Sequence, residues 1–367
     1  MVKSMFAAVA GLRTHQSKMD VIGNNIANVN TYGYKKARVV FKDQFYATLT
    51  KASEAGSSHG GGNPSQVGYG SLVGSIDVNF ASGGVSATDV GMDALIDGNG
   101  FFLVGSKSDN GYRLTSRDNG SGRDSLTALN LTRVGSFNID GQGNLVDSGM
   151  NYVYGFRNYG APGEAADYTK NVEGQEEADG ERVLEFLHVP QIVVDRNGQA
   201  VVRAYDQEGN EVDDPQDPSV TRIEYVYPNE NGQLPDGFDG EDEGYTLAPM
   251  KLYNMGISSD GTVSGINDQK QIVVVGRIAI ANVPNPNALE AIGNSLYQAG
   301  ENTGIVTAEF AGEGSTGLLV SGSLEMSNVD LAQEFTDMIT TQRGFQANTR
   351  IITVTDEMLQ ELVNIKR

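Results

Sequence analysis

The chain contains no cysteine and no tryptophan, and only three of its 367 residues are histidine. Without cysteine there is neither a disulfide nor a thiol nucleophile, although a domain of this size folds without disulfides inside or outside the cell. Without tryptophan, a sugar-binding module built on stacked indole rings is disfavoured. These absences exclude thiol chemistry and leave the cellular compartment open.

Long apolar runs are also missing. No stretch of about 20 apolar residues occurs, so we expect no membrane insertion. The longest run, residues 272–283, contains Gly276 and Arg277 and predicts a strand. Near the N-terminus, Arg13, His15 and Lys18 interrupt the sequence before a long apolar segment forms. We therefore expect no cleavable signal peptide.

Basic residues are scarce, and the net charge is −21. Residues 157–250 carry 22 acidic against 6 basic side chains, whereas the first 46 residues carry seven basic against two acidic ones. Such an acidic surface repels nucleic acid and anionic membranes, so no nucleic-acid partner is expected. We interpret the acidic stretch as a solvated outer face.

Both ends of the chain carry an apolar residue at every seventh position. The N-terminal series is Met5, Leu12, Met19 and Ile26, and the C-terminal series is Leu331, Met338, Phe345, Ile352 and Leu359. A seven-residue repeat keeps a narrow apolar stripe along a helix, and that stripe must be covered by another helix. The termini are thus predicted to pack on each other or on the termini of neighbouring copies.

These repeats predict helices over residues 3–29 and 327–366. Ser327 and Asp330 match a capping box at the start of the second helix. Gly11 and Gly23 are unfavourable inside the first helix by about 1 kcal/mol each relative to alanine. We expect that their missing side chains permit close helix packing.

The middle of the chain has the pattern of short strands and tight turns. Asn-Gly or Asp-Gly occurs eleven times between residues 97 and 261 and nowhere else. These dipeptides supply the positive φ angles of hairpin turns. The clearest hairpin candidates are 95–96, 101–104 and 137–146. The segment from Asp140 to Asn144 resembles a calcium loop, but Leu145 stands where glycine is required, so a turn is predicted.

The predicted fold class is α+β, with mostly β middle domains, barrel- or sandwich-like, and two long terminal helices paired as a coiled-coil-like inner domain. The expected domains are a terminal helical domain (1–30 and 325–367), connecting segments (31–70 and 300–324), a β core (71–155 and 265–299) and an inserted acidic β domain (156–264).

The sequence offers little support for an enzyme. His15, His59 and His188 stand at no spacing that relates them to a nucleophile or a metal. The acidic clusters 213–214 and 241–243 could attract divalent cations, but a solvated loop is the simpler interpretation. The glycine run at 57–64 lacks the ending of a phosphate-binding loop. No cofactor, metal ion or catalytic residue is predicted.

Three segments resemble the bacterial flagellar rod and hook proteins. Residues 24–35 (NNIANVNTYGYK) resemble the N-terminal signature of that family. Residues 327–331 (SNVDL), with Met338-Ile339, Gln342-Arg343 and Gln346-Ala-Asn348, are similar to its closing helix. Gly98-Asn-Gly-Phe-Phe102 and Thr132-Arg-Val-Gly-Ser-Phe137 resemble the motif of its β domain.

The resemblance implies a structural subunit that polymerises with copies of itself into a hollow tube, with the terminal helices as the inner wall. It also implies export without a cleaved signal through the flagellar type III apparatus, a location in the extracellular flagellum, and contacts with rod, hook cap and hook–filament junction proteins. The acidic block and the SNVDL wording favour a hook subunit over a distal rod subunit. An added polar loop at 106–130 departs from the family pattern.

On this interpretation the assembly contacts come from the two apolar series and from polar residues beside them. The polar candidates are Asn24, Asn25, Asn28, Asn30 and Gln342. A surface module that binds glycans is the alternative from another class, and it would use aromatic side chains such as Tyr168, Tyr205 and Tyr245. Ordinary packing within one chain and a simple helix end are the plainer interpretations of the same residues.

Overall fold

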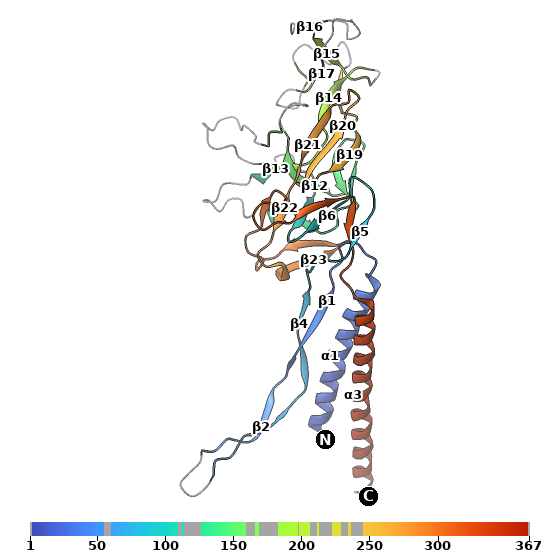
Figure 1. Ribbon diagram of the computed structural model, residues 1–367. Coiled ribbons are helices and arrows are strands. Elements are labelled where there is room, and N and C mark those ends of the chain that lie inside the picture. The colour runs from blue at the N-terminus through green and yellow to red at the C-terminus, as the bar shows by residue number, and fades with distance from the viewer. Residues whose placement is uncertain are drawn as a thin grey trace. The chain divides into compact units, whose positions relative to one another are not determined.

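Figure 1 shows the computed structural model of the chain. It describes residues 2–54, 60–108, 112–113, 126–158, 166–168, 183–196, 198–205, 211–212, 222–228, 234–235 and 245–365. The chain divides into two compact units. Unit 1 comprises residues 1–84 and 326–367, and unit 2 comprises residues 85–325.

Unit 1 contains two long helices and a two-stranded ribbon. The helices are α1 (Val2–Ala27) and α3 (Leu331–Ile365), and the strands are β1 (Ala37–Asp43), β2 (Tyr46–Thr50), β3 (Ser65–Gly68) and β4 (Ser71–Val78). β1 pairs with β4 and β2 pairs with β3, both antiparallel, so the chain runs out along one edge of the ribbon and back along the other (Figure 1).

The start of α3 differs from the predicted capping box. Asp330 is the cap, because its carboxylate accepts hydrogen bonds from the backbone N–H groups of Ala332 (2.9 Å) and Gln333 (3.3 Å). The Ser327 hydroxyl instead accepts from the Val329 N–H at 3.3 Å. The helix therefore begins at Leu331, four residues later than predicted.

Unit 2 is built from strands. They are β5 (Val85–Ala87), β6 (Ala94–Asp97), β7 (Phe101–Gly105), β8 (Tyr112–Arg113), β9 (Asn130–Thr132), β10 (Phe137–Ile139), β11 (Leu145–Asp147), β12 (Tyr152–Arg157), β13 (Val183–Phe186), β14 (Gln191–Val194), β15 (Val202–Tyr205), β16 (Glu211–Val212), β17 (Arg222–Tyr225), β18 (Thr246–Pro249), β19 (Tyr253–Ile257), β20 (Thr262–Ile266), β21 (Ile272–Ile278), β22 (Ile280–Asn282), β23 (Leu289–Gly293), β24 (Leu296–Ala299), β25 (Thr307–Glu309), β26 (Leu318–Ser321) and β27 (Ser323–Glu325). A 3-10 turn, η1 (Pro286–Ala288), precedes β23.

One large sheet organises unit 2. Its path runs β19-β20-β21-β12-β7-β9-β24-β23, and six further strands pair along its length. The central strand β7 is buried at every position, as expected for a strand covered on both faces. Phe102 of β7 meets Phe137 edge to face, with ring centroids 5.0 Å apart, in the middle of the hydrophobic core.

A buried ion pair lies near the last residue of unit 2. Arg133 and Glu325 are 3% and 2% exposed, and their charged groups lie 3.5 Å apart. Arg133 also donates to the carbonyls of Gly98 (2.9 Å) and Ile96 (3.4 Å). The guanidinium thus ties the motif around residue 133 to the strand from which the chain leaves unit 2.

The predicted domain boundaries need correction. We expected a connecting segment at 31–70, but β4 pairs with β1, so residues up to 84 belong with the terminal helices. We also expected a connecting segment at 300–324. That segment instead contributes β25, β26 and β27 to unit 2, paired with β22, β6 and β5.

The acidic stretch 156–264 is not a separate unit in the part that the structure describes. β13 pairs with β12, and β20 pairs with β21, so this stretch adds strands to the large sheet. Leu187, Ile192 and Val263 share one hydrophobic cluster with Phe102. The excess of acidic residues suggested a separate domain. The apolar residues of this stretch are nevertheless buried in the same core as the rest of unit 2.

The predicted hairpins give a mixed outcome. The hairpin over 137–146 is confirmed, because β10 pairs with β11 around the turn at Asp140. The strands at 95–96 and 101–104 exist but do not pair with each other, since β6 pairs with β26 and β7 pairs with β9, β12 and β22. The mostly β middle and the two terminal helices are as predicted, and the barrel- or sandwich-like form stays a prediction.

Candidate assembly interface

The two helices of unit 1 lie side by side and run in opposite directions (Figure 1). Gly11 of α1 lies against Asn348 of α3, and Asn25 of α1 hydrogen-bonds Glu334 at the beginning of α3. Because α1 has only nine residues before Gly11, about eight residues at the end of α3 extend past the start of α1. That end of α3 has no helix beside it within the described chain.

The contact between the helices is made mostly from small and polar residues. On α1 the buried residues are Ala8, Gly11, Thr14, Ile22 and Asn25. On α3 they are Glu334, Thr341 and Thr355. Glu334 and Thr341 are seven residues apart and Thr355 is fourteen further on, so the contact follows its own heptad series, offset by three residues from the apolar one.

The predicted apolar series lies beside this contact. Its half-buried members are Met5, Leu12, Met19, Ile26, Met338, Phe345, Ile352 and Leu359, whereas Leu331 and Gln342 are exposed. The sequence did not distinguish the apolar series from the polar one that packs within the chain, because both have the same period. Within one chain the apolar stripe is therefore only partly covered.

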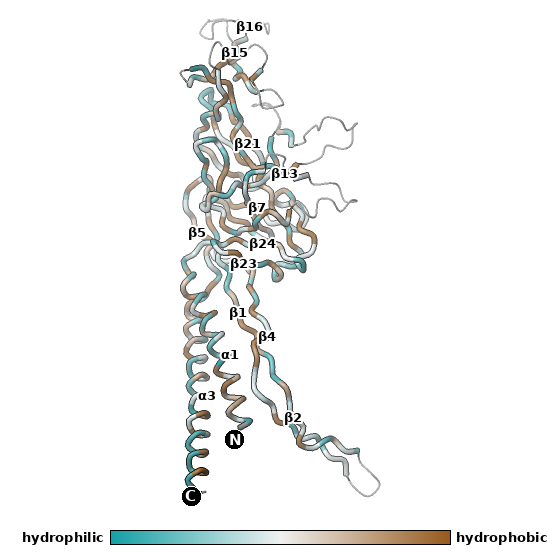
Figure 2. Tube along the Cα trace, turned by 180° about the vertical axis from the view of Figure 1, so that it is seen from behind, coloured by the Kyte–Doolittle hydropathy of each residue, from teal (hydrophilic) through white to brown (hydrophobic). Residues whose placement is uncertain are grey.

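Further apolar side chains on the helices face solvent. Phe335, Ile339 and Val354 are 50%, 57% and 51% exposed. Towards the end of α3, Met358, Leu362, Val363 and Ile365 are also exposed. Figure 2 shows hydrophobic segments along α1 and at the free end of α3. Exposed apolar patches are characteristic of surfaces that contact other molecules.

Asn25 is the centre of the asparagine-rich turn. Its side chain is 1% exposed and donates to the Ala37 carbonyl at 2.9 Å and to Glu334 Oε2 at 3.2 Å. Its Oδ1 accepts from the Ala37 N–H (3.0 Å) and from the Tyr34 hydroxyl (3.1 Å). One amide thus joins the end of α1, the start of β1 and the start of α3.

The other predicted asparagines lie at the surface of this turn. Asn24 donates to the Tyr34 hydroxyl at 3.1 Å, and Asn28 donates back to the Asn24 carbonyl at 3.0 Å. Asn30 is exposed. These bonds shape the exit from α1, and Asn25 alone reaches the second helix.

Sequence reasoning missed three residues that complete this junction. Glu334 is buried beside Asn25. Asn328 accepts from the Lys36 N–H at 2.8 Å and donates to the carbonyl of residue 79 at 2.8 Å. Buried Lys35 donates to the carbonyl of residue 81 at 2.9 Å. Asn328 and Lys35 stand inside the motifs quoted above, but nothing in those motifs reveals their partners.

Burial and neighbouring charge shift two titrating groups here. Burial, and then the charge of Glu334, raise the pKa of Tyr34. Burial, and then the charge of Lys18, lower the pKa of His15. Lys18 forms a part-exposed ion pair with Asp337 of α3 at 3.6 Å. Both shifts favour the neutral form of the side chain.

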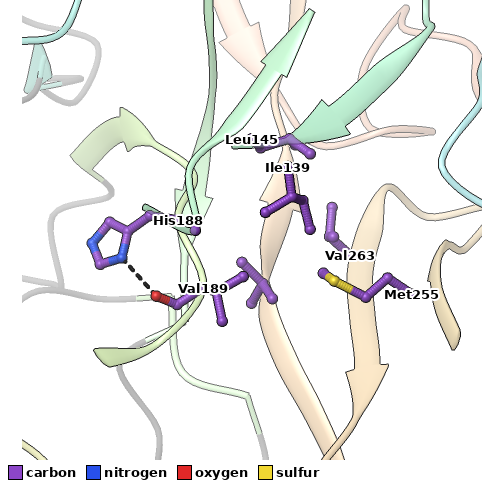
Figure 3. Close-up of a pocket in the computed structure, with 8 residues that line it drawn as sticks. Ile139, Leu145, His188, Val189, Met255 and Val263 are labelled. Carbon is purple, nitrogen blue, oxygen red and sulfur yellow. Dashed lines mark hydrogen bonds between the residues drawn. The ribbon is translucent and has the colours of Figure 1, made fainter. Parts of the chain in front are cut away.

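The remaining candidate residues form no catalytic arrangement in the described structure. Within that part no group of three acidic or histidine side chains is placed to hold a metal ion. Figure 3 shows a cleft lined by Ile139, Gly143, Leu145, His188, Val189, Met255, Val263 and Val275, with no room for a water molecule. His188 Nδ1 donates to the Val189 carbonyl at 3.0 Å.

Other predicted features either lie outside the described residues or are packed. His59 and the acidic clusters at 213–214 and 241–243 lie outside those residues. Tyr168, considered above as a glycan contact, packs against Phe310, with ring centroids 5.6 Å apart, and against the Arg277 guanidinium. No helix among the described residues has the length and apolarity needed to cross a membrane.

Two family models match the ends of the chain. The flagella basal body rod protein model matches residues 5–35, and the flagellar basal body rod FlgEFG protein C-terminal model matches residues 320–365. Both matched segments lie mainly in unit 1 and include the helices and the Asn25 junction described above.

Similar proteins match over essentially the whole chain. The flagellar basal-body rod protein FlgG of Bacillus subtilis is 34% identical, over 100% of both chains. The flagellar hook protein FlgE of Borreliella burgdorferi is 32% identical, also over 100% of both. The hook protein FlgE of Salmonella typhimurium is 29% identical over 99% of this chain and 100% of that protein.

A crystal structure of the Helicobacter pylori flagellar hook protein FlgE2 aligns with a TM-score of 0.34 and 10% identity, over 66% of this chain and 99% of that one. This likeness is too weak to bear on the fold, and the sequence matches decide the family. The chain belongs to the family of bacterial flagellar rod and hook proteins.

Proposed function

We propose that this chain is a structural subunit of the flagellar hook, which assembles with copies of itself through its terminal helices. The observation that carries the proposal is the composition of the helix contact. Small and polar residues fill the α1–α3 contact, and large apolar residues remain on the outside of both helices. The relatives are structural proteins of the flagellum, and in such an assembly neighbouring copies would cover that outside surface.

In the polymer, the terminal helices would form a coiled-coil-like inner domain. The apolar series from Met5 to Ile26 and from Leu331 to Leu359 would pack against helices of adjacent copies, with Gln342 and the asparagine turn at its margin. Each large apolar side chain that becomes fully buried contributes roughly 1.5–3 kcal/mol. The exposed side chains of α3 are numerous enough for this surface to drive assembly.

The ribbon supports the same proposal. Phe45, Tyr46 and Leu49 are 79%, 56% and 60% exposed at its outer part. An isolated two-stranded hairpin is marginally stable in water, and one with exposed aromatic residues is also prone to association. Packing against neighbouring copies would stabilise the ribbon and remove these side chains from water.

The proposal extends to partners and location. Rod proteins would hold one end of the polymer, a hook cap would stand at the growing end, and hook–filament junction proteins would follow it. The subunit would reach the extracellular flagellum through the flagellar type III export apparatus. No enzymatic activity, cofactor or nucleic acid is part of this function.

A distal rod subunit is the second candidate, and one observation favours it. The Bacillus subtilis relative that is 34% identical is named a rod protein, whereas the hook proteins compared here are 29% and 32% identical. Electron microscopy of polymers grown from purified protein separates the two. Curved hollow tubes support the hook, straight stiff tubes support the rod, and absence of any polymer at high protein concentration contradicts both.

A further inference from the structure

The apolar repeats cannot by themselves set the register of the two helices. Met5, Leu12, Met19 and Ile26 recur every seven residues, as do the five members of the C-terminal series. If α3 slid along α1 by one heptad, the two apolar series would stand in the same relation to each other except at their ends. Another feature must therefore select one register, as single polar residues do in coiled coils.

The first such feature is the contact between Gly11 and Asn348. A Cβ atom on Gly11 would lie 2.6 Å from Asn348 Nδ2 and 3.1 Å from Asn348 Cγ. Gly11 is buried in the middle of α1, where glycine costs helix stability. With a Cβ at position 11, the Asn348 amide would have to move from its place against the backbone of α1.

In the second feature the glycine is on α3 and the larger side chain is on α1. Gly344 of α3 receives the imidazole of His15 of α1, and a Cβ on Gly344 would lie 2.8 Å from His15 Nε2 and 2.9 Å from His15 Cε1. Phe41 of β1 packs on the imidazole from another element, with ring centroids 6.2 Å apart. The half-buried imidazole therefore contacts both α3 and β1.

The two contacts form a reciprocal pair. Gly11 and His15 are four residues apart on α1, and Gly344 and Asn348 are four residues apart on α3. In an antiparallel pair these spacings place a glycine opposite a larger side chain on two consecutive turns, in opposite senses. We propose that Gly11 with Asn348, and Gly344 with His15, are the determinants that fix the register of α1 on α3.

The consequence of a slip shows why this pair selects one register. If α3 moved by one heptad, His15 would face Asp337 or Ile351 in place of Gly344, and no space would receive its ring. The same slip would separate Asn25 from Glu334 and Lys18 from Asp337, which are bonded at 3.2 Å and 3.6 Å. The register in turn determines how far the end of α3 extends past the start of α1.

Gly23 provides a matched control on the same helix. It also stands inside α1, but a Cβ there would meet nothing within 4 Å. Alanine raises intrinsic helix stability equally at positions 11 and 23. Any difference between Gly11→Ala and Gly23→Ala therefore reports the contact with Asn348 and not helix propensity.

The test follows the helix circular-dichroism signal at 222 nm during heating, in whichever state of the full chain, free or polymerised, has paired helices. We expect Gly344→Ala and Gly11→Ala to lower the midpoint by about 5 °C or more, the larger shift at Gly344. Gly23→Ala should keep or raise the midpoint. Adding His15→Ala to Gly344→Ala, or Asn348→Ala to Gly11→Ala, should restore part of the loss.

Two results would overturn the inference. One is a midpoint for Gly11→Ala and Gly344→Ala that matches Gly23→Ala. The other is failure of both second substitutions to restore any of the loss, because double variants isolate the pairwise contact. The proposed register concerns two helices of one chain, so the melting midpoints of the variants test it whether or not copies assemble. Failure of the wild-type chain to polymerise would refute the proposed function without changing that judgement.

Discussion

Units 1 and 2 bury different kinds of residue. The described part of unit 1 buries only two apolar side chains, Ala8 and Ile22, whereas unit 2 buries the other 42 buried apolar residues of the structure. Unit 2 has a core that can hold it folded alone. Unit 1 has long helices and a long ribbon but almost no core in its described part, so we expect its stability to come from contacts with other molecules.

Their ion pairs show the same contrast. Arg133 and Glu325 of unit 2 are almost fully buried, whereas Lys18 and Asp337 of unit 1 have side chains 28% and 35% exposed. A buried pair leaves an uncompensated charge in the core when one partner is removed, whereas an exposed pair is largely replaced by water. Unit 2 therefore depends on its own interior, and unit 1 depends on what covers it.

The largest effect that this comparison predicts is at Ile352. Changing Ile352→Glu puts a carboxylate on the apolar stripe, where assembly would bury it without a partner. The lost apolar burial of about 2 kcal/mol adds to the cost of burying a charge, and every subunit of a polymer repeats it. We expect polymerisation to fail, as measured by light scattering and electron microscopy, with the melting of unit 2 unchanged.

Gln346→Glu is the control for that variant, because Gln346 is exposed and lies off the apolar series of α3. It adds the same charge to the same helix and should leave polymerisation near the wild-type level. Normal tubes from Ile352→Glu would show that the stripe is not an assembly surface.

The next effect is within unit 2. Arg133→Met removes the guanidinium from beside buried Glu325, and we expect a loss of about 3–5 kcal/mol in the free energy of unfolding. Denaturant unfolding followed through the strand signal measures it. Lys18→Met removes the part-exposed partner of Asp337 in unit 1. It should lower the free energy of unfolding of the helices, followed through the helix signal, by less than about 1 kcal/mol. Equal costs for the two variants would contradict the contrast between the units.

A smaller effect is expected at the junction of unit 1. Asn25→Ala deletes the amide that holds the Ala37 backbone and Glu334, and it leaves buried polar groups without partners. We expect the free energy of unfolding of unit 1 to fall by about 1–3 kcal/mol. Helix melting should show reduced stability of unit 1 and no change in unit 2. Asn24→Ala, at the exposed neighbour, should have little effect, and an Asn24 loss as large as that at Asn25 would refute the central role of Asn25.

The smallest effect is a pH dependence from His15. Burial lowers its folded pKa below the ordinary value of 6.5. Well above pH 6.5 His15 is neutral whether or not the helices are paired, so it adds no pH dependence there. Below pH 6.5 the unfolded form takes up a proton that the folded form resists, and helix stability falls as the pH falls.

Helix melting between pH 7 and about 5, above the range in which most carboxylates titrate, measures this dependence. His15→Asn should reduce its slope, and His188→Gln in unit 2 should leave the slope of the helix transition unchanged. An identical slope in wild type and His15→Asn would show that the imidazole does not titrate with pairing.

The sequence predicted the two helices and the mostly β middle of the chain, because these depend on periodicity and on turn residues. The heptad repeats place α1 and α3, and Asp140 with its glycine places the β10–β11 hairpin. The β6–β7 hairpin was wrong because turn dipeptides give strand ends and not strand partners. The acidic stretch was wrongly separated because charge reports the surface, whereas Leu187 and Val263 belong to the common core.

The candidate interface was only partly predictable for a related reason. Apolar repeats are conspicuous in a sequence, but on α3 the contact within the chain uses Glu334, Thr341 and Thr355, which look like ordinary surface residues. Gly11 and Gly23 were expected to act alike, yet only Gly11 has a side chain packed on it. Which glycine receives a neighbour depends on the position of the second helix, more than 300 residues away along the chain.

Amide hydrogen exchange, compared between the free subunit and the polymer, tests the central claim most directly. The account predicts that amides in α1 and α3 exchange rapidly in the free subunit and become strongly protected in the polymer, while amides of β7 and β12 are protected equally in both. Strong and equal protection of α1 and α3 in the verified monomer would contradict it, because unit 1 would then be stable without neighbouring copies.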